Sequence, residues 1–281
     1  MALLRNLQYK YQKNIKMGAV QNCYQEIVSN FIASEPEIKA ENNGNELLSH
    51  SEIKEIKREK IDNEKFNFFF QINQTNENIE NSPIQIEVIH VKSTESTMPA
   101  SREYIDQGNK LPFIYNTEIQ TAGVGKGNRK WAGMIEGNLY TSSCIPNKMI
   151  KYEISSKEDL VKITAISIIQ ILRKYTKDQF FLKYPNDIIC KDKRKLGGII
   201  AESYKDFWII GFGINIVDKP DEGEIRKEGL KACFIKEHLP DLDENLKPLE
   251  LSINVKKQII YNLNKITHSN IDKVFDEYII K

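Results

Sequence analysis

Three glycines and three cations share one short segment, QTAGVGKGNRKW, at residues 120–131. Glycine lets backbone N–H groups approach a ligand closely, and neighbouring lysine or arginine side chains can hold an anion. A Walker A loop is excluded because Gln120 stands where glycine is required and no Ser or Thr follows Lys126, and a dinucleotide fingerprint is excluded because Asn128 replaces its last glycine. A flexible, solvated hairpin tip is the alternative interpretation, but it has no use for the indole of Trp131. The segment therefore favours a loop that closes over an anionic ligand with an apolar face.

Three later segments could serve the same ligand. KYPND at 183–187 predicts a turn that presents an amide and a carboxylate, and RKLGGII at 194–200 predicts a strand that begins with two cations. RKLGGII also places two adjacent glycines in its predicted strand, and GFGIN at 211–215 again places two glycines in a strand. Glycine inside a strand costs about 1 kcal/mol relative to a residue with a side chain, so two such pairs indicate a ligand that lies along the sheet.

The elements that must position these segments follow from hydrophobic periodicity. Short apolar runs with period-2 alternation predict strands, and an apolar stripe of helical spacing over residues 159–178 predicts a buried helix. Ser96 or Thr97 is placed to cap a helix over 99–107. The predicted strands cover 66–72, 84–91, 111–120, 138–146 and a series of short runs between 180 and 217, and further helices are expected from residue 255 onward. The expected class is α+β, with a mixed, largely antiparallel sheet packed with helices.

We expect two regions along the 281 residues. Residues 1–65 are predicted to be an N-terminal extension and linker, helical or partly disordered, with linker and exposed helix over 34–65 because large apolar residues are few there. Residues 66–281 are predicted to form the compact domain. The first 20 residues are basic and contain no acid, which resembles a mitochondrial presequence, although a basic helix that packs on the domain fits equally well.

Composition limits the partners. The 40 basic residues nearly cancel the 39 acidic ones, so no nucleic-acid or membrane partner is expected, and no apolar stretch is long enough to cross a bilayer. The four cysteines lie far apart without metal-ligand or disulfide spacing, which favours a reducing compartment and a cytoplasmic location, with mitochondria as the alternative. Whether the chain forms a homodimer is left open.

Over residues 84–217 these motifs resemble, in order, those of the biotin protein ligase (holocarboxylase synthetase) catalytic domain. The matching features are Ser96-Thr97 ahead of a helix, the glycine-rich loop, GNLY at 137–140, KYPND, KLGGII and GFGIN. The resemblance implies a class II synthetase-like fold and two reaction steps. Biotin is first activated by ATP, with magnesium, as biotinyl-5'-adenylate, and the acyl group is then transferred to a lysine of a biotin carboxyl carrier domain.

The resemblance also implies residue roles. The catalytic cations would be Lys195, Lys126 and Arg129, which offset the repulsion between a carboxylate and a triphosphate. The residues assigned to biotin are Ser96, Thr97, Gln120, Gly123, Gly125, Lys126, Gly198, Gly211 and Gly213. Those assigned to the nucleotide are Arg129, Trp131, Asn186, Lys195 and Asn215. Asp187 is the candidate ligand for the metal.

Three departures from the family pattern keep alternatives open. Val124 and Lys126 stand where cationic or arginine residues are usual, Tyr184 replaces a tryptophan, and no C-terminal β-barrel is evident. A catalytically silent paralogue that binds biotin or a carrier is therefore one alternative. The other is a lipoate or octanoyl protein ligase of the same fold, although the Arg-Arg-x-Ser-Gly-Gly-Gly type of loop of those enzymes is absent. The N-terminal region has no recognisable helix-turn-helix, so no DNA-binding role is expected.

Overall fold

The structure is a computed structural model that describes residues 53–62, 64–72, 83–150, 154, 156–175, 179–221, 229–239 and 246–280. These residues belong to one compact unit that spans Leu47–Lys281. Our predictions for residues 1–52, including the basic first helix, lie outside the described residues. Within the described part of the chain, no helix is long and apolar enough to span a membrane.

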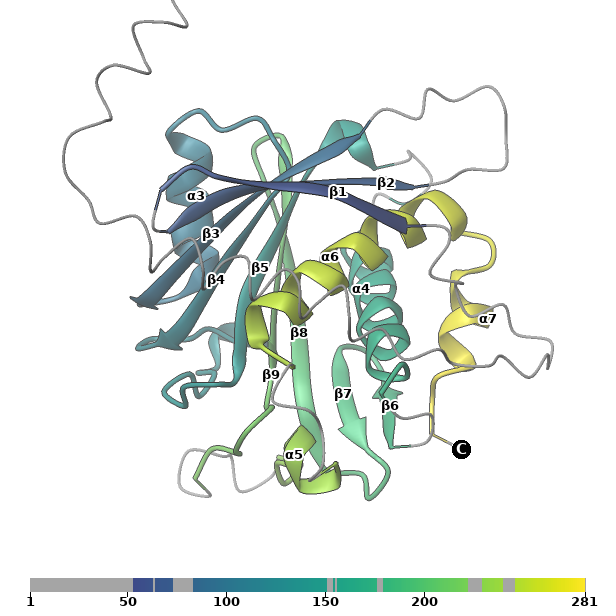
Figure 1. Ribbon diagram of the computed structural model, residues 1–281. Helices are drawn as coiled ribbons and strands as arrows, with labels where there is room; N and C mark the ends of the chain where they lie inside the picture. Colours follow the sequence, from purple (N-terminus) through teal and green to yellow (C-terminus); the bar gives the residue numbers. More distant parts are fainter. Residues whose placement is uncertain are drawn as a thin grey trace, which may run out of the picture. The chain divides into compact units, whose positions relative to one another are not determined.

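A nine-stranded sheet forms the frame of this unit (Figure 1). Its order is β1-β2-β3-β4-β5-β9-β8-β7-β6, and seven of the eight pairings between these strands are antiparallel, with β3 and β4 parallel. The strands are β1 Ile53–Lys60, β2 Lys65–Ile72, β3 Ile84–Thr94, β4 Phe113–Gln120, β5 Leu139–Pro146, β6 Phe180–Lys183, β7 Asp187–Cys190, β8 Lys195–Tyr204 and β9 Phe207–Ile214. The predicted α+β class with a mixed, largely antiparallel sheet is confirmed.

Helices cover both faces of the sheet. They are α3 Thr97–Asp106, α4 Lys157–Leu172, α5 Ile235–His238, α6 Pro248–Lys265 and α7 Ile271–Asp276. The main core packs α4 and α6 on one face, where Figure 1 shows α6 running across the strands. Helix α3 packs on the other face, because Met98 joins Cys144 and Ile209, whose neighbours Ile145 and Ile210 belong to the main core. The α3 face is therefore the one left for the glycine-rich loop.

The sheet begins earlier than we expected. Strand β1, Ile53–Lys60, falls within the stretch 34–65 that we predicted to be linker and exposed helix, so that prediction is wrong for these residues and the ordered sheet does not begin near residue 66. The sequence IKEIKREK is rich in charge, as edge strands commonly are. An edge strand pairs on one side only, and its charged side chains hide the period-2 pattern that would identify it.

The cysteines also differ from expectation. Cys190 and Cys233 form a disulfide across a sequence separation of 43, whereas we expected none. Sequence spacing gave no signal because the segment around Ala232 returns to pair with Lys195 at the start of β8, next to β7. Cys144 is a buried free thiol.

Candidate active site

The glycine-rich loop, residues 121–132, connects β4 to β5 and is folded back on itself; we call it the flap. Its base is closed by a pairing of Gln120 with Gly133, and its middle by a pairing of Val124 with Lys130. A single 3-10 turn, Lys126–Asn128, forms the tip, where Gly127 has φ +67°, the left-handed region that glycine adopts without strain. The loop thus joins strand to strand, as predicted.

The flap lies over the centre of the sheet. In register across the strands, Tyr140 of β5 pairs with Gly213 of β9, Gly213 with Gly198 of β8, and Gly198 with Asp187 of β7. A Cβ atom added at Gly213 would lie 2.5 Å from both Cε2 and Nε1 of Trp131, and one added at Gly198 would lie 3.1 Å from its Cζ3. The indole of the flap therefore rests directly on the two strand glycines.

This packing changes our explanation of the strand glycines. We inferred that they leave space for a ligand along the sheet, but side chains of the protein take up part of that space. Trp131 covers Gly213, and Sδ of Met98 would lie 2.8 Å from a Cβ at Gly211. The glycines thus allow the flap and α3 to approach the sheet closely, and the ligand space lies beside and above them.

A cavity of about 370 Å³ is lined by residues of both the flap and the sheet. Of the predicted site residues, Ser96, Thr97, Gln120, Gly125, Lys126, Arg129, Trp131, Asn186, Asp187, Lys195, Gly198, Gly211, Gly213 and Asn215 line it. Gly123 does not line it. Its role is at the base of the flap, where its carbonyl accepts the N–H of Trp131 at 2.8 Å and a Cβ would collide with the carbonyl of that residue.

One end of the cavity is polar and buried. Ser96, Thr97 and Gln120 are 3%, 3% and 7% exposed. The Oε1 atom of Gln120 accepts the backbone N–H of Thr97 at 2.8 Å, which leaves its Nε2 as a donor. Thr97 Oγ1 accepts from Ser142 Oγ at 2.8 Å, so its own hydroxyl proton is available. Ser96 occupies the N-cap position of α3 as expected, but its side chain makes no capping hydrogen bond.

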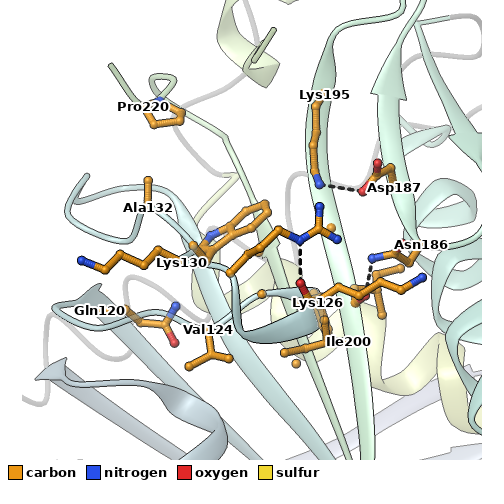
Figure 2. Close-up of a pocket in the computed structure, with 18 of the residues that line it drawn as sticks. Gln120, Val124, Lys126, Lys130, Ala132, Asn186, Asp187, Lys195, Ile200 and Pro220 are labelled. Atoms are coloured by element: carbon orange, nitrogen blue, oxygen red, sulfur yellow. Dashed lines mark hydrogen bonds and ion pairs between the residues drawn. The ribbon is translucent and has the colours of Figure 1, made fainter. Parts of the chain in front are cut away.

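The other end carries charge (Figure 2). Lys195 Nζ donates to Asp187 Oδ1 at 2.6 Å and lies 5.5 Å from the ring centre of Trp131. Lys126 and Arg129 approach from the exposed flap, where Arg129 Nε donates to the Lys126 carbonyl at 2.6 Å. Strands β4 and β8 are three strand spacings apart, so the axes of the strands that carry Gln120 and Lys195 lie about 14 Å from each other.

The two asparagines have structural contacts in addition to their place in the lining. Asn186 Nδ2 donates to the carbonyl of Ile199 at 2.9 Å, which fixes the 184–186 turn against β8. Asn215 is buried, and its Nδ2 donates to the carbonyl of Cys233 at 3.0 Å. Both amides therefore position the walls of the cavity, and their predicted role in nucleotide binding stays a prediction.

Among the residues that the structure describes, Asp187 is the single carboxylate in the cavity lining. Its Oδ1 is already paired with Lys195, so a divalent cation there would face an ammonium group at close range. These residues do not by themselves form a Mg²⁺ site.

Several lining residues gave no sequence signal. Met98 follows the Ser-Thr pair on α3 and resembles an ordinary core residue, and Lys130 was counted among the three cations of the loop but was assigned no role of its own. The segment 229–232 lies between the last predicted strand, which ends by residue 217, and the helices predicted from residue 255, yet Gly229, Leu230 and Ala232 line the cavity. It is held there because Lys195 N donates to the Lys231 carbonyl at 2.7 Å, a contact between residues far apart in sequence.

Comparison with known proteins gives consistent matches. Residues 90–215 match the family described as Biotin/lipoate A/B protein ligase family. A stretch of 117 residues is 31% identical to the bifunctional ligase/repressor BirA of Escherichia coli, which is 40% of this chain and 35% of that protein. The match thus spans about a third of the length of this curated relative.

Two solved structures share the fold. The biotin protein ligase of Leishmania major in complex with biotin has a TM-score of 0.61 and 25% identity, over 69% of this chain and 81% of that one. The biotin protein ligase of Aquifex aeolicus in complex with biotin and ATP has a TM-score of 0.57 and 25% identity, over 69% of this chain and 78% of that one.

Proposed function

From the match of residues 90–215 to the biotin/lipoate A/B protein ligase family, we propose that the chain belongs to this family, activates biotin with ATP and transfers it to a protein lysine. The solved relatives bind biotin, and one of them binds biotin and ATP together. The observation that carries the proposal is the single cavity in which the flap cations and Lys195 stand opposite a buried polar end.

In the first step an oxygen of the biotin carboxylate attacks the α-phosphorus of ATP. The bond from that phosphorus to the bridging oxygen breaks, and pyrophosphate leaves with the electron pair. Two anions must approach each other for this to occur, and the ammonium of Lys195 with Lys126 and Arg129 offsets their repulsion. Asp187 positions Lys195 through the 2.6 Å contact.

In the second step the amine of an acceptor lysine attacks the acyl carbon of the biotinyl adenylate. AMP leaves, and the amine loses a proton to give the amide. The flap is suited to hold the mixed anhydride between these steps because it combines cations, a glycine at its tip and the indole lid. The acceptor that we propose is a biotin carboxyl carrier domain.

The polar end of the cavity favours biotin over lipoate. Biotin has a ureido group that can pair with the Gln120 Nε2 donor and with the Ser96 and Thr97 hydroxyls. The dithiolane ring of lipoate has no such groups, so its binding would leave buried polar atoms unpaired. Loss of hydrogen bonds of this kind commonly discriminates strongly against the wrong ligand.

The test is exchange of labelled pyrophosphate into ATP, measured with biotin and separately with lipoate. We expect exchange that depends on biotin and little exchange with lipoate. Exchange with lipoate alone would assign the chain to the lipoate branch, and exchange with neither acid would identify a silent binding protein. Transfer is then measured on a carrier domain, with the acceptor lysine replaced by arginine as the control.

A further inference from the structure

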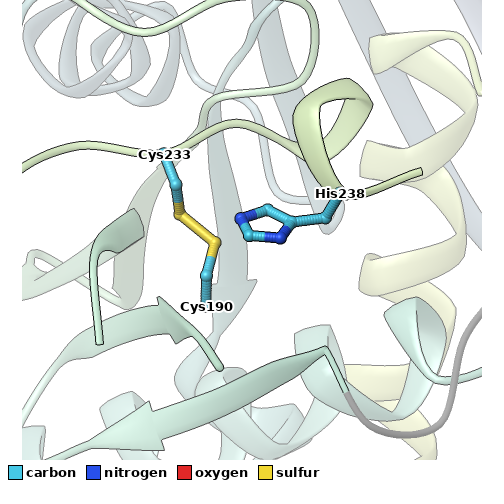
Figure 3. A group of neighbouring side chains, drawn as sticks. All are labelled: Cys190, Cys233 and His238. Carbon is cyan, nitrogen blue, oxygen red and sulfur yellow. A yellow bond between two sulfur atoms is a disulfide. The ribbon is translucent and has the colours of Figure 1, made fainter. Parts of the chain in front are cut away.

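A second group of reactive side chains lies behind the wall of the cavity. It consists of Cys190 at the end of β7, Cys233 in the segment after residue 229, and His238 at the end of α5 (Figure 3). Both cysteines are fully buried. One sulfur or nitrogen atom from each of the three residues lies within 4.8 Å of the others. Figure 3 shows the imidazole ring pointing toward the two sulfur atoms.

The imidazole has an unsatisfied nitrogen. Nε2 of His238 is buried and has no hydrogen-bond partner among the described residues. A carboxylate oxygen of Asp192 lies 3.9 Å from it, beyond hydrogen-bond distance, and Asp192 already accepts from Arg194 at 2.7 Å. A buried nitrogen left without a partner destabilises the fold, so this position favours a ligand.

We propose that Cys190, Cys233 and His238 form a binding site for one zinc-class divalent ion when the disulfide is reduced. Two thiolates and one imidazole are the donor set that zinc prefers, and a fourth position remains for water or for Asp192. With Zn–S bonds of about 2.3 Å and tetrahedral angles, the two sulfurs would lie about 3.8 Å apart. The Cα atoms are 6.9 Å apart, so rotation of the side chains can open the sulfurs to this distance with the backbone in place.

The chemistry balances in two steps. A phosphine reductant with water breaks the S–S bond and gives two thiols, and the phosphine is oxidised to its oxide. Zinc then binds the two thiolates, two protons are released, and the metal undergoes no redox change. The disulfide and the metal complex are therefore alternative ways of joining the same two cysteines.

The disulfide and the metal complex would each fix the segment around Cys233, which forms part of the cavity wall. The N–H of Cys233 donates to the Lys195 carbonyl at 2.9 Å, and the Cys233 carbonyl accepts from Asn215. Ala232 pairs with Lys195 and lines the cavity. The proposal stands on the donor atoms alone and does not depend on the ligase reaction.

The test uses the full chain, reduced with a phosphine under anaerobic conditions and freed of metal. Titration with Co²⁺ is expected to give a thiolate-to-cobalt charge-transfer band that saturates at one equivalent and is removed by Zn²⁺. Zinc binding should release about two protons at a pH where the thiols are protonated. Absence of a stoichiometric band in the reduced chain would overturn the proposal.

Variants identify the ligands. Cys190→Ser and Cys233→Ser should each abolish the band, and His238→Gln should weaken Co²⁺ binding by at least about 10-fold. Cys144→Ser and Cys23→Ser are the matched controls and should keep the band. A band that survives in the Cys190→Ser, Cys233→Ser double variant would contradict the assignment.

A measurement on the unmodified sequence covers the case in which a variant does not fold. The reduced chain is alkylated with iodoacetamide, with and without Zn²⁺, and the modified peptides are identified by mass spectrometry. We expect zinc to slow the modification of Cys190 and Cys233 by about 10-fold or more relative to the reduced, metal-free chain. Equal labelling with and without zinc would overturn the proposal.

Discussion

Gly213→Ala tests the contact between the flap and the sheet. The new Cβ would lie 2.5 Å from Cε2 and Nε1 and 2.7 Å from Cζ2 of Trp131. Carbon atoms in contact are ordinarily about 3.5–4.0 Å apart, so the indole must retreat by about 1 Å or more. The ring is rigid and cannot yield by rotating one terminal atom, so the flap itself must lift.

The magnitude follows from the cost of overpacking, which is typically about 1–3 kcal/mol. If closure of the flap is coupled to ligand retention, this corresponds to about a 5- to 150-fold rise in the biotin KM of pyrophosphate exchange. Gly211→Ala is the matched control. Its Cβ would meet the flexible Sδ of Met98 at 2.8 Å, which can move aside, so we expect a smaller effect.

The decisive comparison is a double-mutant cycle with Trp131→Ala. Without the indole, the alanine at position 213 has no clash, so Gly213→Ala should add little to the loss caused by Trp131→Ala alone. Fluorescence in a Trp208→Phe background isolates the emission of Trp131 and should shift to longer wavelength in Gly213→Ala as the ring is exposed. Equal losses in both backgrounds, with unchanged emission, would refute the reasoning.

The remaining predictions concern single residues. Asp187→Asn should lower biotin-dependent exchange by about 10-fold, less than Lys195→Ala, because it loosens the lysine without removing its charge. Thr97→Val should raise the biotin KM by about 10-fold in the same assay, since it removes a hydroxyl that Ser142 holds in place. Burial lowers the pKa of Lys256 from 10.5 to about 7. The native state then binds fewer protons than the unfolded state between these values, so stability falls as pH falls from about 10 to 7, by up to about 1.4 kcal/mol per pH unit. Urea unfolding at several pH values should show that Lys256→Met lacks this contribution.

The sequence was informative where periodicity and turn residues act locally. The apolar stripe of α4 and the alternation in β3 and β4 predict their elements because side-chain burial sets the pattern directly. The glycine loop was predicted to run from strand to strand for the same local reason. We did not predict edge strand β1 because its many charged residues hide the period-2 alternation that identifies a strand.

Contacts between distant segments could not be predicted. Nothing near Cys190 in sequence indicates that residues 229–233 return beside β8, so neither the disulfide nor that wall of the cavity was anticipated. Nor does the strand pattern show that Trp131 rests on Gly213, since this depends on how the flap folds over the sheet. Cytoplasmic or mitochondrial location stays a prediction, and whether the chain dimerises stays open.

The central claim is that Lys195, together with the flap cations, holds a carboxylate against the α-phosphate of ATP. It is tested most directly by biotin-dependent pyrophosphate exchange with Lys195→Ala, compared with Lys148→Ala, which changes an exposed lysine outside the cavity lining. The loss of one preorganised charge contact costs about 10²- to 10³-fold, and we expect such a loss in exchange rate for Lys195→Ala and no change for Lys148→Ala. An exchange rate for Lys195→Ala within about 3-fold of the unmodified protein would contradict the account, because such a change is far smaller than this range.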